Sequence, residues 1–409
     1  MKKILFILYT CCILLFPVSA QQIPSFKAND RIVFLGNSIT EGGHYHSYIW
    51  LYYMTHFPEL PLRIYNGGIG GDCASHMVFR FDSDIKIKKP TYLVCSFGMN
   101  DSGYDGYNKP GYDKYANKQV EYANTEFGKL QQQILADKKI KNVVLLGSSP
   151  YDENVKLEGV ETLHGKNETI KRIIEMQAEV AQKRGWGFVN FNTVMCELNK
   201  EIQQSDSTAT FCGGDRIHPD KDGHMVMAYL FLKAQGLAGK EVAYFHINAT
   251  NRKAMEERNC RITHIKNEND TISFSYLSRS LPFPVDTIPR WGTKGTARDA
   301  VRQVPFMQEM NQEIMKVTDL HGNFRVTIDG TEIGRWDGNE LSKGINLAEI
   351  TCTPQYQQSL SIMYLNEERC AIEKRLRQYM AMQYVFFKHR GLLFADNKAA
   401  LDAAKAERE

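Results

Sequence analysis

The feature that most restricts the fold of this chain is a regular alternation of short apolar runs with longer amphipathic stretches, from Arg31 to about Leu237. Five runs have strand length and few polar residues, which is typical of parallel strands covered by helices on both faces. These runs are Ile32 to Leu35, Leu62 to Tyr65, Tyr92 to Phe97, Val143 to Leu146 and Phe188 to Phe191. The pattern predicts a three-layer α/β/α sandwich around a five-stranded parallel sheet.

Beyond about residue 240 the pattern changes, and we expect an α+β appendage over residues 241–409. At 409 residues the chain is longer than a single core usually supports, so a second module is expected. Apolar residues alternate over 272–276, and again over 324–328 before Asp329-Gly330, a strong two-residue hairpin signal. A long helical pattern follows Pro354 and extends toward Arg390. The appendage is therefore predicted to contain two hairpins and helices.

The first twenty residues have the composition of a secretory signal peptide. Lys2 and Lys3 precede an apolar run from Ile4 to Val18, and small residues lead to Ala20. We therefore expect export to the periplasm or the extracellular space, with the α/β domain over residues 21–240. No later segment approaches the roughly 20 apolar residues of a spanning helix, so stable membrane insertion is not expected.

The charge balance indicates no nucleic-acid partner. The formal charge is +3, and removal of residues 1–20 takes away two lysines and no acids, which leaves +1. A chain this close to neutral lacks the basic surface that binds phosphate backbones. The sequence does not indicate an oligomeric state.

The first apolar run leads into Gly36-Asn37-Ser38-Ile39-Thr40. Ligands of open α/β sheets bind at the carboxyl edge of the strands, so Ser38 is placed as a candidate nucleophile. A G-x-S-x-G sequence would indicate the nucleophile elbow of α/β-hydrolases, but position 40 is Thr. That fold is therefore disfavoured.

Two further runs end in residues that can stabilise a developing negative charge. The second of the five apolar runs, Leu62 to Tyr65, is followed by a glycine run that ends at Gly71. Backbone N–H groups can approach a reacting oxygen there. The third of the five apolar runs, Tyr92 to Phe97, is followed by Gly98-Met99-Asn100-Asp101, which makes the Asn100 amide a second candidate donor. As a dinucleotide-binding fingerprint the glycine run fails, because Cys73 stands where a third glycine is needed.

An acid and a histidine precede the last helical stretch, in Asp215-Arg216-Ile217-His218-Pro219. Three residues of separation let the carboxylate fix the orientation and tautomer of the imidazole, whose other nitrogen can accept the proton of Ser38. Ser38, His218 and Asp215 are therefore candidates for nucleophile, base and orienting acid.

The stretch from Arg31 to Leu237 resembles the SGNH or GDSL-like hydrolases, whose four sequence blocks appear here as GNSIT, GGIGG, GMND and DRIH. The resemblance implies a flavodoxin-like sandwich, acyl-ester hydrolysis, and no metal or organic cofactor. It also implies an oxyanion hole made by the N–H groups of Ser38 and Gly71 and the side chain of Asn100. The family most often has Asp at position 37, where this chain has Asn, and an Asn side chain can still bond the local backbone.

Other polar residues near these motifs have open roles. His44 and His46 form an H-x-H pair close to Ser38, for which we considered substrate contact, loop packing or a metal site, although no third ligand is identifiable. Tyr104 follows Asn100 on a glycine-rich loop, where a tyrosine can contact a sugar face or simply pack. We list all three as candidate substrate-binding residues.

The sequence therefore predicts an exported esterase that removes short acyl groups, acetyl in particular, from a carbohydrate. Its substrate would be a small-molecule or polysaccharide ester. The alternatives are a lipid or arylester hydrolase with the same triad, acyl transfer to a sugar, and a non-catalytic glycan-binding protein. For the extension from residue 241 onward, we hypothesise that it packs on the hydrolase domain as a wall or lid over the site.

Overall fold

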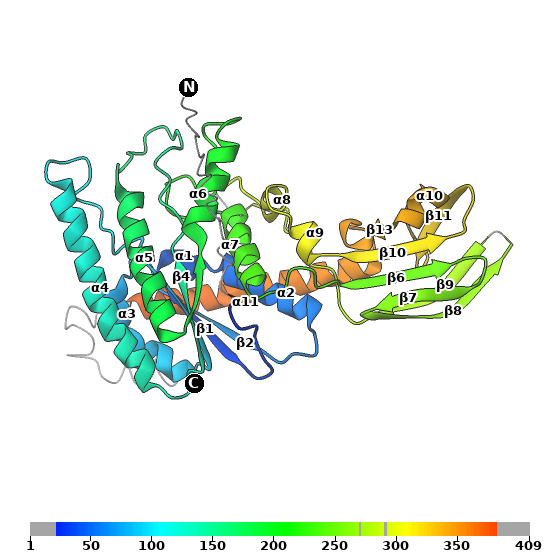
Figure 1. Ribbon diagram of the computed structural model, residues 1–409, viewed down its shortest axis with the longest axis horizontal. Helices are drawn as coiled ribbons and strands as arrows, with labels where there is room; N and C mark the ends of the chain where they lie inside the picture. Colours follow the sequence, from blue (N-terminus) through cyan, green and yellow to red (C-terminus); the bar gives the residue numbers. More distant parts are fainter. Residues whose placement is uncertain (1–21, 270, 290–292, 383–409) are drawn as a thin grey trace, which may run out of the picture.

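The computed structural model describes residues 22–269, 271–289 and 293–382 (Figure 1). The predicted signal peptide, residues 1–20, lies outside the described residues, and so does the end of the helical pattern that extends toward Arg390.

A five-stranded parallel sheet forms the centre of the larger part of the molecule, with strand order β2-β1-β3-β4-β5. This is the flavodoxin-like order, in which the strand sequence reverses beside β1. The strands are β1 (Arg31–Gly36), β2 (Arg63–Gly68), β3 (Tyr92–Phe97), β4 (Asn142–Gly147) and β5 (Gly187–Asn190). All five predicted strands are confirmed, with ends that differ from the predicted ones by up to three residues, the largest difference being at the end of β2.

Helices cover both faces of this sheet and give the predicted three layers. They are α1 (Ser38–Gly42), α2 (His44–His56), α3 (Ala74–Arg80), α4 (Tyr112–Ala136), α5 (Lys166–Arg184), α6 (Phe191–Ile202) and α7 (Lys221–Ala234). On one face Phe34 of β1 packs in a core with Tyr52 of α2 and Phe231 of α7. On the other, Val33 packs in a second core with Phe127 of α4. Successive β1 residues thus point to opposite faces, as the pleat of a strand requires.

The strands after residue 240 lie to the right of the parallel sheet in Figure 1. The two predicted hairpins are confirmed as β8–β9 and β11–β12, and a four-stranded sheet of order β13-β10-β6-β7 was not predicted. In that sheet β6 pairs with β10 in parallel. The strands are β6 (Ala243–Asn248), β7 (Lys253–Arg258), β8 (Cys260–Glu268), β9 (Thr271–Ser278), β10 (Glu313–Thr318), β11 (Asn323–Ile328), β12 (Thr331–Asp337) and β13 (Ile345–Asn346).

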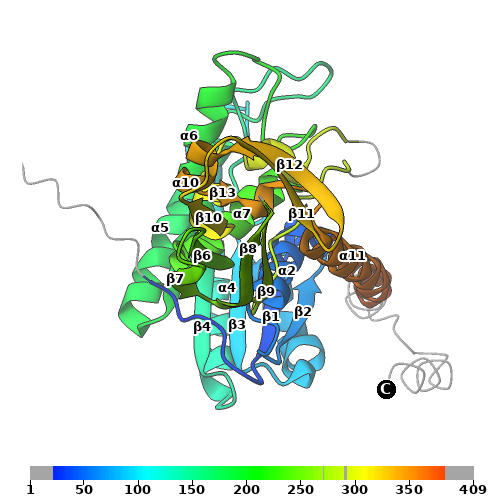
Figure 2. The same cartoon turned by 90° about the vertical axis from the view of Figure 1, so that its right-hand side faces the viewer.

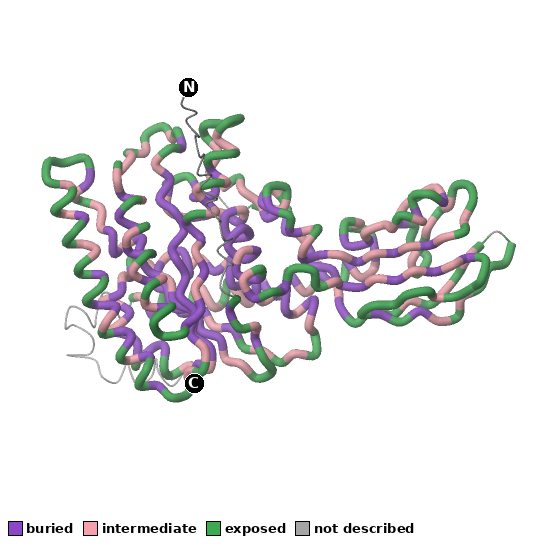
Figure 3. Tube along the Cα trace, in the orientation of Figure 1, coloured by how far each residue is buried: buried purple, intermediate pink, exposed green. Residues whose placement is uncertain are grey.

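The last described helix returns from this β-rich part to the parallel sheet (Figures 1 and 2). The helices of the extension are α8 (Ala297–Ala300), α9 (Phe306–Met310), α10 (Gly338–Lys343) and α11 (Pro354–Ala381). Helix α11 contacts α2, β2 and α1. Residues of α11 that lie 307 and 309 positions after their partners in the chain are hydrogen-bonded to β2. Figure 3 shows buried residues along the central strands and exposed ones along the hairpins. Among the described residues, no helix combines the length and apolar character needed to cross a membrane.

Candidate active site

Ser38 lies at the carboxyl edge of β1, as the first residue of α1. The preceding residue, Asn37, is the N-cap of this short helix, and its Oδ1 accepts a hydrogen bond from the Ile39 N–H at 3.0 Å. This satisfies one of the backbone donors that a helix start leaves without a partner. The expectation that Asn37 can bond the local backbone is confirmed.

Ser38, His218 and Asp215 are joined by two hydrogen bonds, although Ser38 lies 180 residues from His218 in the chain. His218 Nε2 is 2.7 Å from Ser38 Oγ, and His218 Nδ1 is 2.5 Å from Asp215 Oδ2. Because an ionised carboxylate only accepts, Nδ1 carries the proton and Nε2 is left to accept from the serine. Burial acts to raise the pKa of the Asp215 carboxyl, but hydrogen bonds from His218 outweigh it and hold that pKa below its ordinary value. The carboxylate therefore stays ionised at neutral pH.

These side chains are accessible to a substrate. The His218 side chain is 40% exposed and that of Asp215 is 50% exposed. The loop that carries them is nevertheless fixed, because Asp215 Oδ1 also accepts the N–H groups of Ile217 and His218, at 3.0 and 2.9 Å. The arrangement combines an open face with a preorganised acid and base.

The same loop is anchored by Arg216, a residue that was not among the predicted site residues. Arg216 has a φ of 70° and is buried, and its Nη1 donates to the carbonyl oxygens of Asp152 and Val155, at 3.1 and 2.6 Å. Gly213 makes the turn possible, because a Cβ there would lie 1.9 Å from the His218 carbonyl oxygen. The sequence feature that could have identified Arg216 is its position, because it is a long cationic side chain between the two site residues Asp215 and His218.

The glycine run and the β3 end come together as the sequence predicted. Gly71 has a φ of 80°, and a Cβ there would meet open space. Asn100 Nδ2 donates one hydrogen to the Asp72 carbonyl oxygen at 2.8 Å, which leaves its second hydrogen for another acceptor. The Tyr104 hydroxyl donates to Asn100 Oδ1 at 2.8 Å and so fixes which end of the amide is the donor.

Tyr104 is thus placed beside the candidate oxyanion donor. Burial raises the pKa of its hydroxyl to about 12, which keeps the group protonated and able to donate. The centroid of its ring lies 3.8 Å from Lys166 Nζ, which donates to the carbonyl oxygens of Met99 and Gly103 at 2.9 and 2.6 Å. Lys166 therefore holds the loop on which Asn100 stands, a role that was not predicted from the sequence.

His44 and His46 lie on a helix, α2, and not in a loop. His46 is buried, with Nε2 3.2 Å from the Thr40 carbonyl oxygen, and burial lowers the pKa of its imidazole to about 4. This favours packing over substrate contact for His46. His44 Nδ1 lies 4.0 Å from Glu367 of α11, which directs it toward the extension. Within the described residues, no group of three or more His, Cys, Asp and Glu side chains is arranged to hold a metal ion.

A serine, a histidine and a carboxylate joined by hydrogen bonds at the strand edge of a parallel sheet form an arrangement suited to ester hydrolysis. The GDSL-like lipase/acylhydrolase family matches residues 34–226, and the diltiazem deacetylase C-terminal helical domain matches residues 360–409. The structure of a gut microbial diltiazem-metabolizing enzyme is 49% identical, with a TM-score of 0.90, and the match covers 95% of this chain and 88% of that chain. The chain belongs to the GDSL-like lipase/acylhydrolase family, and it is an ester-bond hydrolase.

More distant similarity covers about half of the chain. An acetylxylan esterase of Geobacillus stearothermophilus is 22% identical over 224 residues, which are 51% of this chain and 95% of that protein. A crystal structure of an acetylxylan esterase from the same organism is 20% identical, with a TM-score of 0.40, and covers 51% of this chain and 95% of that chain.

Proposed function

We propose that this protein is a serine esterase that removes short acyl groups, acetyl in particular, with Ser38 as nucleophile, His218 as base and Asp215 as orienting acid. The observation that carries the proposal is the continuous hydrogen-bonded chain from Ser38 Oγ to His218 Nε2, at 2.7 Å, and from His218 Nδ1 to Asp215 Oδ2. Such a chain lets a neutral imidazole take the serine proton as the hydroxyl oxygen attacks.

In the acylation half-reaction, His218 Nε2 removes the proton from Ser38 Oγ, which forms a bond to the ester carbonyl carbon. The carbonyl oxygen becomes an oxyanion and accepts hydrogen bonds from the N–H groups of Ser38 and Gly71 and from Asn100 Nδ2. Each such donor is worth roughly 10²- to 10³-fold in turnover. When the tetrahedral intermediate collapses, the alcohol leaves with the proton from His218.

Deacylation repeats the sequence with water. His218 Nε2 takes a proton from the water, whose oxygen bonds to the acyl carbon, and the same three donors receive the second oxyanion. Collapse breaks the bond to Ser38 Oγ, which regains its proton from His218, and the carboxylic acid is released. Asp215 stays ionised throughout and stabilises the imidazolium.

A carbohydrate ester, the substrate expected from the sequence, is the first candidate. It is supported by the acetylxylan esterase relative and by an open site, in which the exposed His218 and Asp215 leave room for a bulky alcohol part. A second candidate is the acetyl ester of a small aromatic compound. It is supported by the 49% identical diltiazem-metabolizing enzyme and by the matching deacetylase domain.

Acetate release from acetylated polysaccharides, an aryl acetate and diltiazem would rank these candidates. Aryl esters of increasing acyl length would separate a short-chain esterase, whose kcat/KM falls with length, from a lipid hydrolase, whose kcat/KM rises. Product analysis with an acceptor sugar present would reveal acyl transfer. Binding of a glycan without any acetate release would instead favour the non-catalytic alternative.

We further propose export to the periplasm or the extracellular space, supported by the composition of residues 1–20. The mass of the mature protein from a secreting host tests this, since cleavage after Ala20 removes those residues. A mature chain that keeps them would contradict the proposal.

A further inference from the structure

The C-terminal extension reaches the glycine run through one face of α11. Arg377 is 3% exposed, and its Nε donates to the Gly68 carbonyl oxygen at 3.1 Å. One helical turn earlier, Glu373 Oε1 accepts the N–H of Asn66 at 2.7 Å. Residues four apart on a helix lie on the same side, so both contacts come from one stripe. This stripe holds the backbone of β2 at the point where the glycine run begins.

Arg377 also forms a bidentate ion pair with Asp84, which lies in a short π-helix (Phe81–Ile85) after α3. Its Nη1 and Nη2 donate to the two carboxylate oxygens of Asp84, each at 2.7 Å. Burial acts to raise the pKa of Asp84, but the positive charges of Arg377, Lys88 and Arg80 outweigh it and hold that pKa well below its ordinary value. Asp84 is therefore an ionised carboxylate shared by three cations.

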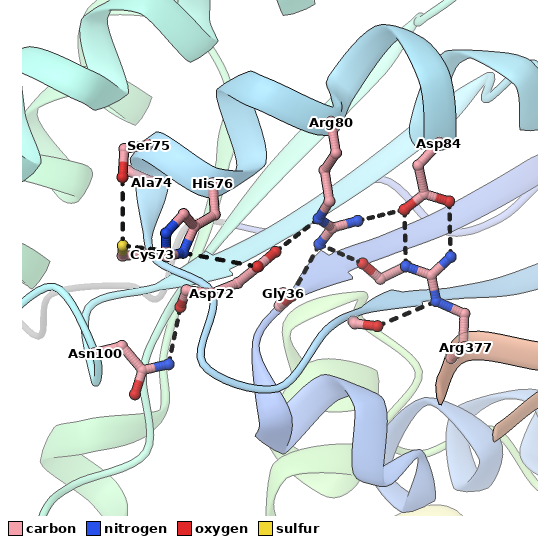
Figure 4. Close-up of polar contacts among 12 residues, drawn as sticks. Gly36, Asp72, Cys73, Ala74, Ser75, His76, Arg80, Asp84, Asn100 and Arg377 are labelled. Atoms are coloured by element: carbon pink, nitrogen blue, oxygen red, sulfur yellow. Dashed lines mark hydrogen bonds and ion pairs between the residues drawn. The ribbon is translucent and has the colours of Figure 1, made fainter. Parts of the chain in front are cut away.

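Arg80 links Asp84 to the glycine run. It is 1% exposed, and it donates to Asp84 through Nη1 and to Asp72 Oδ2 through Nε, the latter at 2.6 Å. Its Nη2 donates to the carbonyl oxygens of Gly36 and Gly67, at 3.2 and 2.7 Å. Figure 4 shows both guanidinium groups in contact with the Asp84 carboxylate, Arg80 through one of its oxygens and Arg377 through both. One arginine thus ties together the ends of β1 and β2 and the far end of the glycine run.

Asp72 connects this network to two of the three candidate oxyanion donors, Gly71 and Asn100. It directly follows Gly71, and its carbonyl oxygen accepts the hydrogen bond from Asn100 Nδ2 at 2.8 Å. A glycine run has no side chains of its own to fix its conformation, and an oxyanion hole acts only if its donors are held in place before the reaction. The two arginines supply that restraint at Gly67, Gly68 and Asp72.

We propose that Arg377 is a positioning residue for the oxyanion hole, acting on Gly71 and Asn100 through Asp84, Arg80 and Asp72. The extension then holds the glycine run in its conformation and contributes to turnover in this indirect way. The inference rests on the proposed serine mechanism, because it assigns Arg377 an effect on the charge that develops in that reaction.

The test compares Arg377→Gln with wild type by steady-state kinetics on a short-chain aryl acetate. Asp84 keeps Arg80 and Lys88 as partners in this variant, so no buried carboxylate is left alone. A shift of the donors by a fraction of an ångström is expected to lower kcat by roughly 10- to 100-fold, with KM changed little. Affinity for an aryl boronic acid, which forms a tetrahedral adduct with a serine oxygen, should fall in parallel.

Three further variants separate positioning from stability. Arg377→Lys keeps one charge beside Asp84 and should recover part of kcat. Arg375→Gln removes an exposed charge from the same helix and should leave kcat unchanged. Met380→Ala, at a buried position of α11, should lower the melting temperature but not kcat at a temperature where the protein is folded. If Arg377→Gln does not fold, the contrast between Arg377→Lys and Met380→Ala carries the test.

A folded Arg377→Gln enzyme with the kcat and boronic-acid affinity of wild type would overturn the inference. So would a Met380→Ala enzyme that loses kcat as much as the Arg377 variants. Failure of the serine mechanism is seen separately, because Ser38→Ala would then keep its activity whatever the Arg377 variants do.

Discussion

Replacing Asp215 by Asn tests the orientation of His218 with little change in shape. In the native site, Asp215 Oδ1 accepts the backbone N–H groups of Ile217 and His218, and Oδ2 accepts from His218 Nδ1. An asparagine oxygen can keep the two backbone bonds, so the loop should hold its conformation. Its NH2 group, however, would face Nδ1 as a donor. The imidazole then favours the tautomer with the proton on Nε2, which donates toward Ser38 and cannot take its proton.

The expected loss in kcat follows from which contacts change. Two of the three hydrogen bonds of Asp215 survive, so stability should change by no more than about 1 kcal/mol, the size of one hydrogen bond. The surviving tautomer is the wrong one for catalysis, and the imidazolium that forms loses its neighbouring negative charge. A triad altered in this way loses roughly 10⁴-fold in kcat. This corresponds to about 5.5 kcal/mol of transition-state stabilisation.

The assay is acetate release from an aryl acetate at pH 7, with thermal unfolding measured on the same samples. Asp113→Asn removes an exposed carboxylate from the first turn of α4 and serves as the matched control, with wild-type kcat expected. If Asp215→Asn unfolds like wild type and keeps kcat within about tenfold, Asp215 does not set the tautomer of His218 for catalysis.

Two other predictions concern stability. Gly213→Ala places a Cβ 1.9 Å from the His218 carbonyl oxygen at a φ of 73°, so urea unfolding should show a loss of roughly 1–3 kcal/mol, while Gly214→Ala, with no atom within 4 Å, should not. Burial lowers the pKa of His56 to about 4 from 6.5, so the folded state resists its protonation and the free energy of unfolding should fall by about 3 kcal/mol as pH drops from 6.5 to 4. His56→Gln should flatten that pH dependence, and an equal slope of unfolding free energy against pH in wild type and His56→Gln would contradict the prediction. Equal losses of unfolding free energy in Gly213→Ala and Gly214→Ala would contradict the other one.

The parallel sheet and the groups at its edge could be predicted because their signals are local. Each buried strand is a short apolar run, and β3 was predicted residue for residue at Tyr92–Phe97. Ser38, Asn100 and His218 follow strands or precede the last helix, and the carboxyl ends of parallel strands meet at one edge. The order of these motifs was therefore enough to bring them together.

Helix α2 was missed for a physical reason. Most of its residues between Tyr45 and His56 are buried on all sides, so it has no polar face and shows no amphipathic period. The H-x-H pair was read as part of a loop for that reason, and closeness to Ser38 in sequence made His46 look like a site residue. Its side chain instead points into the core.

The remaining omissions come from contacts between distant residues. The parallel pair of β6 and β10 joins segments about 70 residues apart, and Arg377 meets Gly68 across 309 residues. Neither leaves a mark in the local pattern of apolar and polar residues. Only the folded chain shows that a helix of the extension supports the glycine run.

The most direct test of the serine mechanism is acetate release by wild type and Ser38→Ala, measured on acetylated polysaccharides and on a short-chain aryl acetate. Ser207→Ala, at an exposed position, is the matched control and should behave like wild type. We predict that Ser38→Ala folds normally and loses kcat by a factor on the order of 10⁶, as expected for residues that act as a unit. Equal acetate release by wild type and Ser38→Ala would contradict the mechanism.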